Sequence, residues 1–142
     1  MILVDTGAWL ALVDHGDAYH ERCRRFFRGN REQMVTTLPV LVETVHLMYA
    51  RVGVERTLRW LDAVAATGLV VRDSRQAELA RLIALMQRYA NLPMDVADAS
   101  LVLAAEDLGD GRIVTTDERD FDTYRWKDRA PFTNLLRDGT AP

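Results

Sequence analysis

The chain has 142 residues, of which 49% are hydrophobic and 27% are charged, and its formal net charge is -3. These values are typical of one globular domain with a buried core, and they exclude two domains and an overall basic surface for a polyanion. The single cysteine, Cys23, excludes an intrachain disulfide and a metal site built on several thiolates.

The ends of the chain and its hydrophobic runs indicate where one domain lies. We expect the domain to cover residues 1–137 and a short polar tail to cover residues 138–142. Asp5 interrupts the first hydrophobic stretch, and no uncharged run is long enough to span a bilayer. We therefore expect neither a leader peptide nor a membrane span, and a cytoplasmic location.

The first half of the chain predicts two short strands and four helices. Residues 2–4 form an apolar run that ends at Asp5, as a buried parallel strand would. A second strand is predicted at residues 34–35, and Thr37 with Pro39 supplies an N-cap and an early proline for the next helix. The predicted helices cover residues 8–13, 18–28, 37–51 and 54–66.

The second half predicts two further helices between short strands. Ser74 is placed to cap a helix that runs to Tyr89. Asp95 opens another helix that ends near Gly109, and this helix is apolar on nearly every side, which predicts deep burial. The predicted strands cover residues 69–71 and 113–115, and residues 132–133 would add a fifth strand.

Strands that alternate with helices predict a parallel sheet covered on both faces. We therefore predict an α/β fold, specifically a three-layer α/β/α sandwich with a mostly parallel sheet of four to five strands.

Two acids directly follow predicted strands. Asp5 ends the first strand and Asp117 follows the fourth. Either residue could simply cap the next helix, and Asp117 with Asp120 has near capping-box spacing. The carboxyl ends of parallel strands are also where open α/β sheets bind ligands.

Two more acids lie on predicted helices beside apolar residues. Glu43 shares a helix stripe with Val40 and Leu47, so its carboxylate needs an arginine, a metal ion or a proton as a partner. Asp95 has the better position for an N-cap, which leaves Asp98 facing inward from the same helix turn.

The set of four acids, Asp5, Glu43, Asp98 and Asp117, predicts a divalent-cation site. No histidine or cysteine accompanies them, and all-oxygen ligand sets select Mg²⁺ or Mn²⁺. Clustered carboxylates repel one another unless a cation neutralises them. Such sites commonly hydrolyse phosphodiester bonds by activating water.

The motifs that carry these acids resemble those of PIN domains, most closely the VapC-type toxin ribonucleases. They are residues 2–6, Glu43, residues 95–99 and residues 114–121. The resemblance covers nearly the whole chain and implies a PIN-like fold and a metal-dependent ribonuclease. It assigns catalysis to the four acids, with Asp5, Asp98 and Asp117 as metal ligands. Supporting positions are Thr6, Asp95, Thr116 and Asp120, and Asp95 and Asp98 remain alternatives for the principal ligand.

The resemblance also implies partners. These are an RNA substrate, Mg²⁺ or Mn²⁺, a cognate antitoxin protein and a second copy of the chain in a homodimer. A housekeeping RNA-processing nuclease is the alternative to a toxin.

Other readings of the same acids use different chemistry. One is a non-catalytic binding module in which the acids form a structural salt-bridge network. Another is phosphotransfer through an aspartyl phosphate. One class of such proteins needs a second acid at the position of Gly7, and another needs a lysine after a late strand, whereas Lys127 lies outside any predicted strand.

Overall fold

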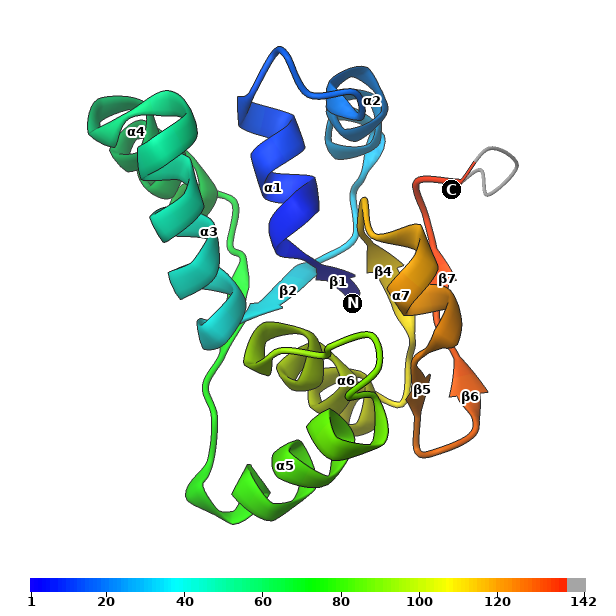
Figure 1. The fold of residues 1–142 in the computed structure, drawn as a ribbon. Coiled ribbons are helices and arrows are strands. Elements are labelled where there is room, and N and C mark those ends of the chain that lie inside the picture. The colour runs from blue at the N-terminus through cyan, green and yellow to red at the C-terminus, as the bar shows by residue number, and fades with distance from the viewer. Residues whose placement is uncertain (138–142) are drawn as a thin grey trace.

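The structure is a computed structural model that describes residues 1–137, and the predicted polar tail at 138–142 lies outside the described residues. Five strands form one parallel sheet in the order β3-β2-β1-β4-β7 (Figure 1). The strands are β1 (Ile2–Val4), β2 (Met34–Thr37), β3 (Val70–Arg72), β4 (Arg112–Val114) and β7 (Thr133–Asn134).

The order of the strands reverses beside β1. The chain moves from β1 outward through β2 to β3 and then crosses back to place β4 on the other side of β1. Leu3 of β1 is thus in register with Val35 of β2 and with Ile113 of β4. The crevice at the carboxyl ends of β1 and β4 is the topological switch point, where open parallel sheets bind ligands.

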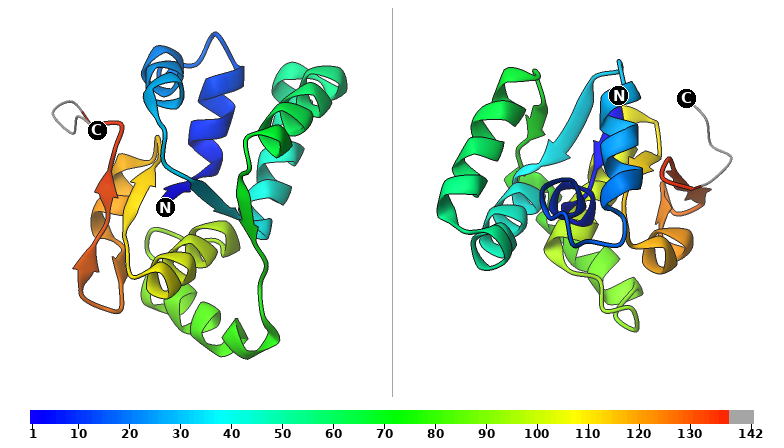
Figure 2. Two further views of the ribbon diagram at one scale, coloured as in Figure 1. Left: turned by 180° about the vertical axis from the view of Figure 1, so that it is seen from behind. Right: turned by 90° about the horizontal axis from the view of Figure 1, so that it is seen from above.

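Helices cover both faces of the sheet, as Figures 1 and 2 show from three directions. The connections between β1 and β3 place four helices on one face: α1 (Thr6–Val13), α2 (His20–Gly29), α3 (Leu38–Val52) and α4 (Val54–Ala66). The return connection contributes η1 (Gln76–Glu78), α5 (Leu79–Arg88) and α6 (Val96–Leu108), and α5 and α6 lie on the other face. The short helix α7 (Glu118–Thr123) follows β4.

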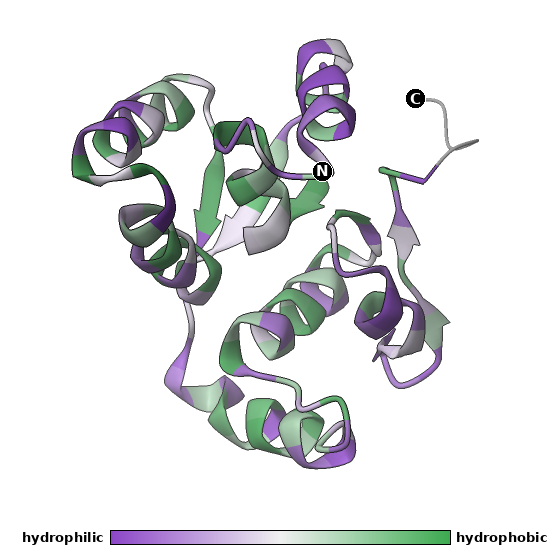
Figure 3. Ribbon diagram, turned by 45° about the horizontal axis from the view of Figure 1, so that its top comes forward, coloured by the Kyte–Doolittle hydropathy of each residue, from purple (hydrophilic) through white to green (hydrophobic). Residues whose placement is uncertain are grey.

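The core is built from the strands and from the helices nearest to them. Leu3, Val4, Ile113 and Val114 are completely buried in the two central strands. Helix α6 is buried along most of its length, as its apolar sequence predicts, and Figure 3 shows hydrophobic residues in strands of the sheet and along the helices. This three-layer α/β/α sandwich confirms the predicted fold class.

The helix predicted to begin at Ser74 starts later, and this boundary prediction was wrong. The Ser74 backbone N–H donates to Asp73, and the Arg75 backbone N–H donates to the Glu78 carboxylate at 3.2 Å, where η1 opens before α5 begins. Ion pairs from Arg72 and Arg75 to Glu78, and to Asp107 of α6, hold this segment extended. Local cap preferences do not reveal a network that depends on α6.

A two-stranded antiparallel hairpin was not predicted. It consists of β5 (Arg125–Trp126) and β6 (Ala130–Pro131), and Lys127 lies in its turn rather than in a stretch without strands. The Trp126 indole N–H donates to the Pro131 carbonyl at 2.9 Å and packs against Gly111, where a Cβ would lie 2.3 Å from the indole nitrogen. Strands of two residues carry no periodicity that a sequence pattern could show.

Residues 1–137 contain no helix that combines the length and the apolar character needed to cross a lipid bilayer.

Candidate active site

Asp5 and Asp117 are joined through one hydroxyl at the switch point. The Thr115 hydroxyl donates to Asp5 Oδ2 at 2.7 Å and accepts the backbone N–H of Asp117 at 3.0 Å. The Thr6 backbone N–H donates to the other oxygen of Asp5, Oδ1, at 2.7 Å. Both oxygens of the buried Asp5 carboxylate are therefore fixed in place.

Both strand-end acids also cap helices, as the structural alternative expected. Asp5 is the N-cap of α1, and Asp117 caps α7 by accepting the Asp120 backbone N–H at 3.1 Å. The cap occupies Oδ1 of Asp117. Capping therefore describes part of the role of these acids, and it leaves their negative charge unneutralised.

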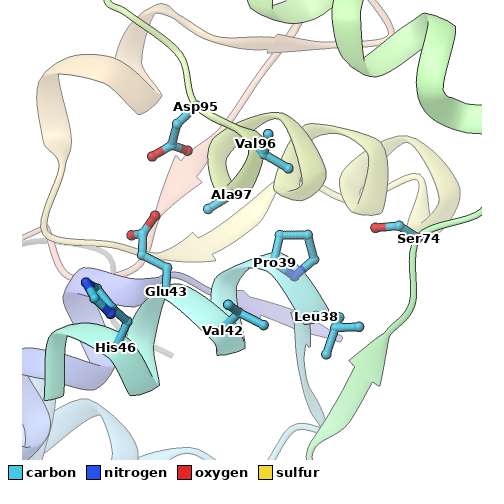
Figure 4. A pocket seen from close by; sticks show the side chains of 9 residues that line it. All are labelled: Leu38, Pro39, Val42, Glu43, His46, Ser74, Asp95, Val96 and Ala97. Carbon is cyan, nitrogen blue, oxygen red and sulfur yellow. The ribbon is translucent and has the colours of Figure 1, made fainter. Parts of the chain in front are cut away.

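Helices α3 and α6 bring Glu43 and Asp95 to the same crevice. The Thr37 and Ser100 hydroxyl groups share a hydrogen bond of 2.6 Å that ties the start of α3 to the first turns of α6. Figure 4 shows the carboxylates of Glu43 and Asp95 pointing toward one another. Asp95 is the N-cap of α6 and accepts the backbone N–H of Asp98 at 2.8 Å, which confirms the predicted cap.

Asp98 is half-buried on α6 and receives a hydrogen bond from a buried phenol. The Tyr124 hydroxyl donates to Asp98 Oδ2 at 3.0 Å. Burial and the charge of Asp98 raise the pKa of Tyr124 well above its usual value, so the phenol remains a donor. The backbone of Asp95 also hydrogen-bonds the Asp98 carboxylate.

The acids raise one another's pKa values. Burial, and then the charges of Asp95 and Asp5, raise the pKa of Asp98 to about 8. Burial raises the pKa of Asp5 to about 6 despite the donors on Thr115 and Thr6, with smaller contributions from Asp117 and Asp95.

The other two acids show the same direction of change. Burial, and then the charge of Asp95, raises the pKa of Glu43 to about 6. Partial burial raises the pKa of Asp117, the most exposed of the four. A cluster with these values carries more negative charge than its surroundings neutralise.

The salt-bridge alternative is not what the described structure contains. Within residues 1–137, none of the four acids lies within ion-pair distance of an arginine, lysine or histidine. Over the same residues, no three acidic, histidine or cysteine side chains are close enough to enclose a metal ion as they stand. The all-carboxylate donor set itself fits Mg²⁺ or Mn²⁺.

Besides Asp95, two of the supporting positions, Thr6 and Asp120, lie beside the acids. The Thr6 hydroxyl lies 3.4 Å from the Val40 carbonyl and lowers the pKa of Glu43. Asp120 is buried and pairs with Arg119 at 2.8 Å, and its charge raises the pKa of Asp117.

Thr116 lies elsewhere in the crevice. Its hydroxyl packs over Gly7, where a Cβ would come within 2.1 Å of Thr116 Oγ1. The role that the resemblance gives to Thr116 stays a prediction.

Sequence reasoning missed three polar residues that support the acids. They are Thr115, Tyr124 and Asn134, all buried. The Asn134 amide donates to the Thr115 carbonyl at 2.9 Å and so anchors the end of β4 to β7. A threonine between a strand and an aspartate was a usable signal, whereas the contacts of Tyr124 and Asn134 depend on tertiary packing.

An apolar pocket of about 610 Å³ opens beside Glu43 and Asp95 (Figure 4). Its hydrophobic side chains include the exposed Leu38 and Val42 of α3 and Val96 of α6. The lining residues come from α3, from the start of α6 and from the segment after β3: Leu38, Pro39, Val42, Glu43, His46, Ser74, Asp95, Val96 and Ala97.

Comparisons with known proteins bear on the family and the fold of the chain. The family model described as PIN domain matches residues 2–127. The chain is 26% identical over 124 residues to "Ribonuclease VapC26" of Mycobacterium tuberculosis, which covers 87% of this chain and 92% of that relative. The crystal structure of the M. tuberculosis VapC20 toxin, described as cleaving the sarcin-ricin loop, superposes with a TM-score of 0.76 at 23% identity. That superposition covers 84% of this chain and 92% of the other, and it shows likeness of fold.

Proposed function

The chain belongs to the PIN domain family, and from this premise we propose that it is a metal-dependent endoribonuclease and the toxin of a toxin–antitoxin pair. The observation that carries the proposal is the cluster of Asp5, Glu43, Asp98 and Asp117 at the switch point. These acids have raised pKa values, and among residues 1–137 none of them lies within ion-pair distance of an arginine, lysine or histidine.

The proposed chemistry assigns each acid a task. A bound Mg²⁺ or Mn²⁺ would activate water and stabilise charge on the phosphate. Asp5, Asp98 and Asp117 would hold the cation. Glu43 has a pKa near 6 because of burial and Asp95, which suits a group that accepts a proton from the attacking water near neutral pH. Asp95 would cap α6 and share the charge of the site.

The names of similar proteins support the substrate and the biological role. One relative is named a ribonuclease and one solved structure is a toxin that cleaves the sarcin-ricin loop. We therefore propose RNA as the substrate and the cytoplasm as the place of action.

An antitoxin is expected to block the acidic crevice. An arginine or lysine of the antitoxin could replace the metal and form charge-assisted hydrogen bonds with Glu43 or Asp98. The apolar pocket next to Glu43 would supply further contacts for an amphipathic helix or an extended segment. We also expect a homodimer, in which a second copy covers part of the exposed hydrophobic surface. Light scattering measures the molar mass and so distinguishes a dimer from a monomer.

The test is cleavage of RNA by the purified chain. Activity should require Mg²⁺ or Mn²⁺ and stop with EDTA, and Asp5→Asn should abolish it. Asp62→Asn is the matched control, because Asp62 is an exposed acid on α4 outside the cluster. Cleavage that continues undiminished in EDTA would refute the mechanism. Growth arrest by the wild type that a neighbouring small gene relieves would distinguish a toxin from an RNA-processing enzyme.

A further inference from the structure

Tyr124 is a buried residue whose polar end reaches the acidic cluster. Its side chain is completely buried, yet its hydroxyl lies 3.0 Å from Asp98 Oδ2. Once a bound cation keeps Asp98 ionised, a hydrogen bond to its carboxylate is stronger than one between neutral groups, so this contact would restrain the carboxylate as well as the phenol.

Neighbouring aromatic rings hold the Tyr124 ring in place. The Tyr89 ring lies edge-on at 5.0 Å between centroids, and the Phe121 ring lies edge-on at 5.2 Å. Phe121 in turn packs edge-on against Phe132 at 5.2 Å. Because the ring cannot shift without disturbing this cluster, the position of its hydroxyl is fixed by the core.

Helix α7 connects this hydroxyl to another acid of the site. Asp117 is the N-cap of α7 and Tyr124 is its C-cap. One short element therefore presents Asp117 at one end and, at the other end, a donor to Asp98 of α6. The hydrogen bond links the element after β4 to the start of α6.

We propose that Tyr124 is a positioning residue that orients the Asp98 carboxylate for binding of a divalent cation. This inference rests on the proposed function. A carboxylate whose Oδ2 is held by a fixed donor loses rotational freedom. With the Asp95 backbone as a further donor, the Asp98 carboxylate still retains lone pairs for a ligand bond. Donors that orient metal-binding carboxylates in this way commonly change metal affinity by about 10–100-fold when they are removed.

The test compares Tyr124→Phe with Tyr89→Phe in the full chain. Tyr89 belongs to the same aromatic cluster, but its hydroxyl accepts the Arg125 backbone N–H at 3.1 Å. Each substitution removes one buried hydroxyl and keeps the ring. Calorimetric titration with Mn²⁺ should show about 10-fold weaker binding for Tyr124→Phe and wild-type binding for Tyr89→Phe. RNA cleavage by Tyr124→Phe should recover at saturating Mn²⁺, which loss of fold would not allow.

Three outcomes would overturn the inference, and they separate it from the proposed function. Wild-type Mn²⁺ affinity in Tyr124→Phe would show that the hydroxyl does not act on Asp98. Equal weakening in both variants would show that the aromatic cluster supports the site only as a whole. A wild-type chain that binds no Mn²⁺ would refute the proposed function itself, and the positioning role with it.

Discussion

Replacing Asp98 with asparagine should stabilise the metal-free protein at neutral pH. Burial and the charges of Asp95 and Asp5 raise the pKa of Asp98 from 3.8 to about 8, so the folded state resists ionisation of this group. Asparagine keeps nearly the same shape and can still accept the Tyr124 hydroxyl. The cap between Asp95 and the backbone of residue 98 does not depend on the side chain that is replaced.

The magnitude follows from the interval between the two pKa values. Because the pKa of Asp98 is raised in the folded state, its protonated side chain does not lower the free energy of unfolding below about pH 4. The free energy of unfolding then falls as the pH rises from about 4 through about 8. At pH 7 roughly three pH units of that interval have been crossed, which sets a ceiling of about 4 kcal/mol. Water entry and side-chain relaxation reduce this value, and we expect a gain of about 1–3 kcal/mol for Asp98→Asn.

Urea denaturation in EDTA at pH 4, 7 and 9 measures the effect. The wild type should lose stability relative to Asp98→Asn between pH 4 and pH 7, and the gap should widen further by pH 9. The control Asp62→Asn, at an exposed position on α4, should follow the wild type. An Asp98→Asn variant that is less stable than wild type at pH 7 would refute the electrostatic reasoning and favour a structural role for the carboxylate.

Three further substitutions test the packing around the site. Thr115→Val removes the donor to Asp5, so a buried carboxylate oxygen loses its partner, and the free energy of unfolding in urea should fall by about 1–3 kcal/mol. An unchanged denaturation midpoint would contradict the contact. Gly111→Ala places a Cβ 2.3 Å from the Trp126 indole nitrogen, so it should lower the free energy of unfolding by about 1–3 kcal/mol and change the tryptophan fluorescence. A stable variant with an unchanged spectrum would argue against this packing. Met48→Ala empties a completely buried position on α3 and should lower stability by about 2–5 kcal/mol in the same assay, whereas a loss under 1 kcal/mol would mean that the core closes over the space.

The order and type of the main elements could be predicted because each depends on a local pattern. Short apolar runs gave the strands of the sheet, and apolar periodicity with caps such as Thr37 and Asp95 gave the helices. The four acids stood out because they follow strands or lie among apolar neighbours. Asp5 and Asp117 converge because the carboxyl ends of β1 and β4 meet at one edge, whereas Glu43 and Asp98 reach the site from α3 and α6. The roles of the individual acids stay predictions.

The features that sequence reasoning missed depend on residues far apart in the chain. The late start of α5 follows from ion pairs to Asp107, and the contact between Tyr124 and Asp98 follows from the packing of α7 against α6. The β5–β6 hairpin turns through Lys127 and Asp128 with positive φ values, where glycine or asparagine is the usual signal. No local preference indicated that turn.

The hydrogen bond between Thr115 and Asp5 joins residues that are 110 positions apart, and this separation affects when the site can exist during synthesis. Strand β1 is made first, but its partner β4 and the aspartate that follows it are translated only in the last quarter of the chain. A nascent chain therefore carries Asp5 and Glu43 on the ribosome without their counterparts. The proposed site is therefore incomplete until synthesis of the chain is nearly finished.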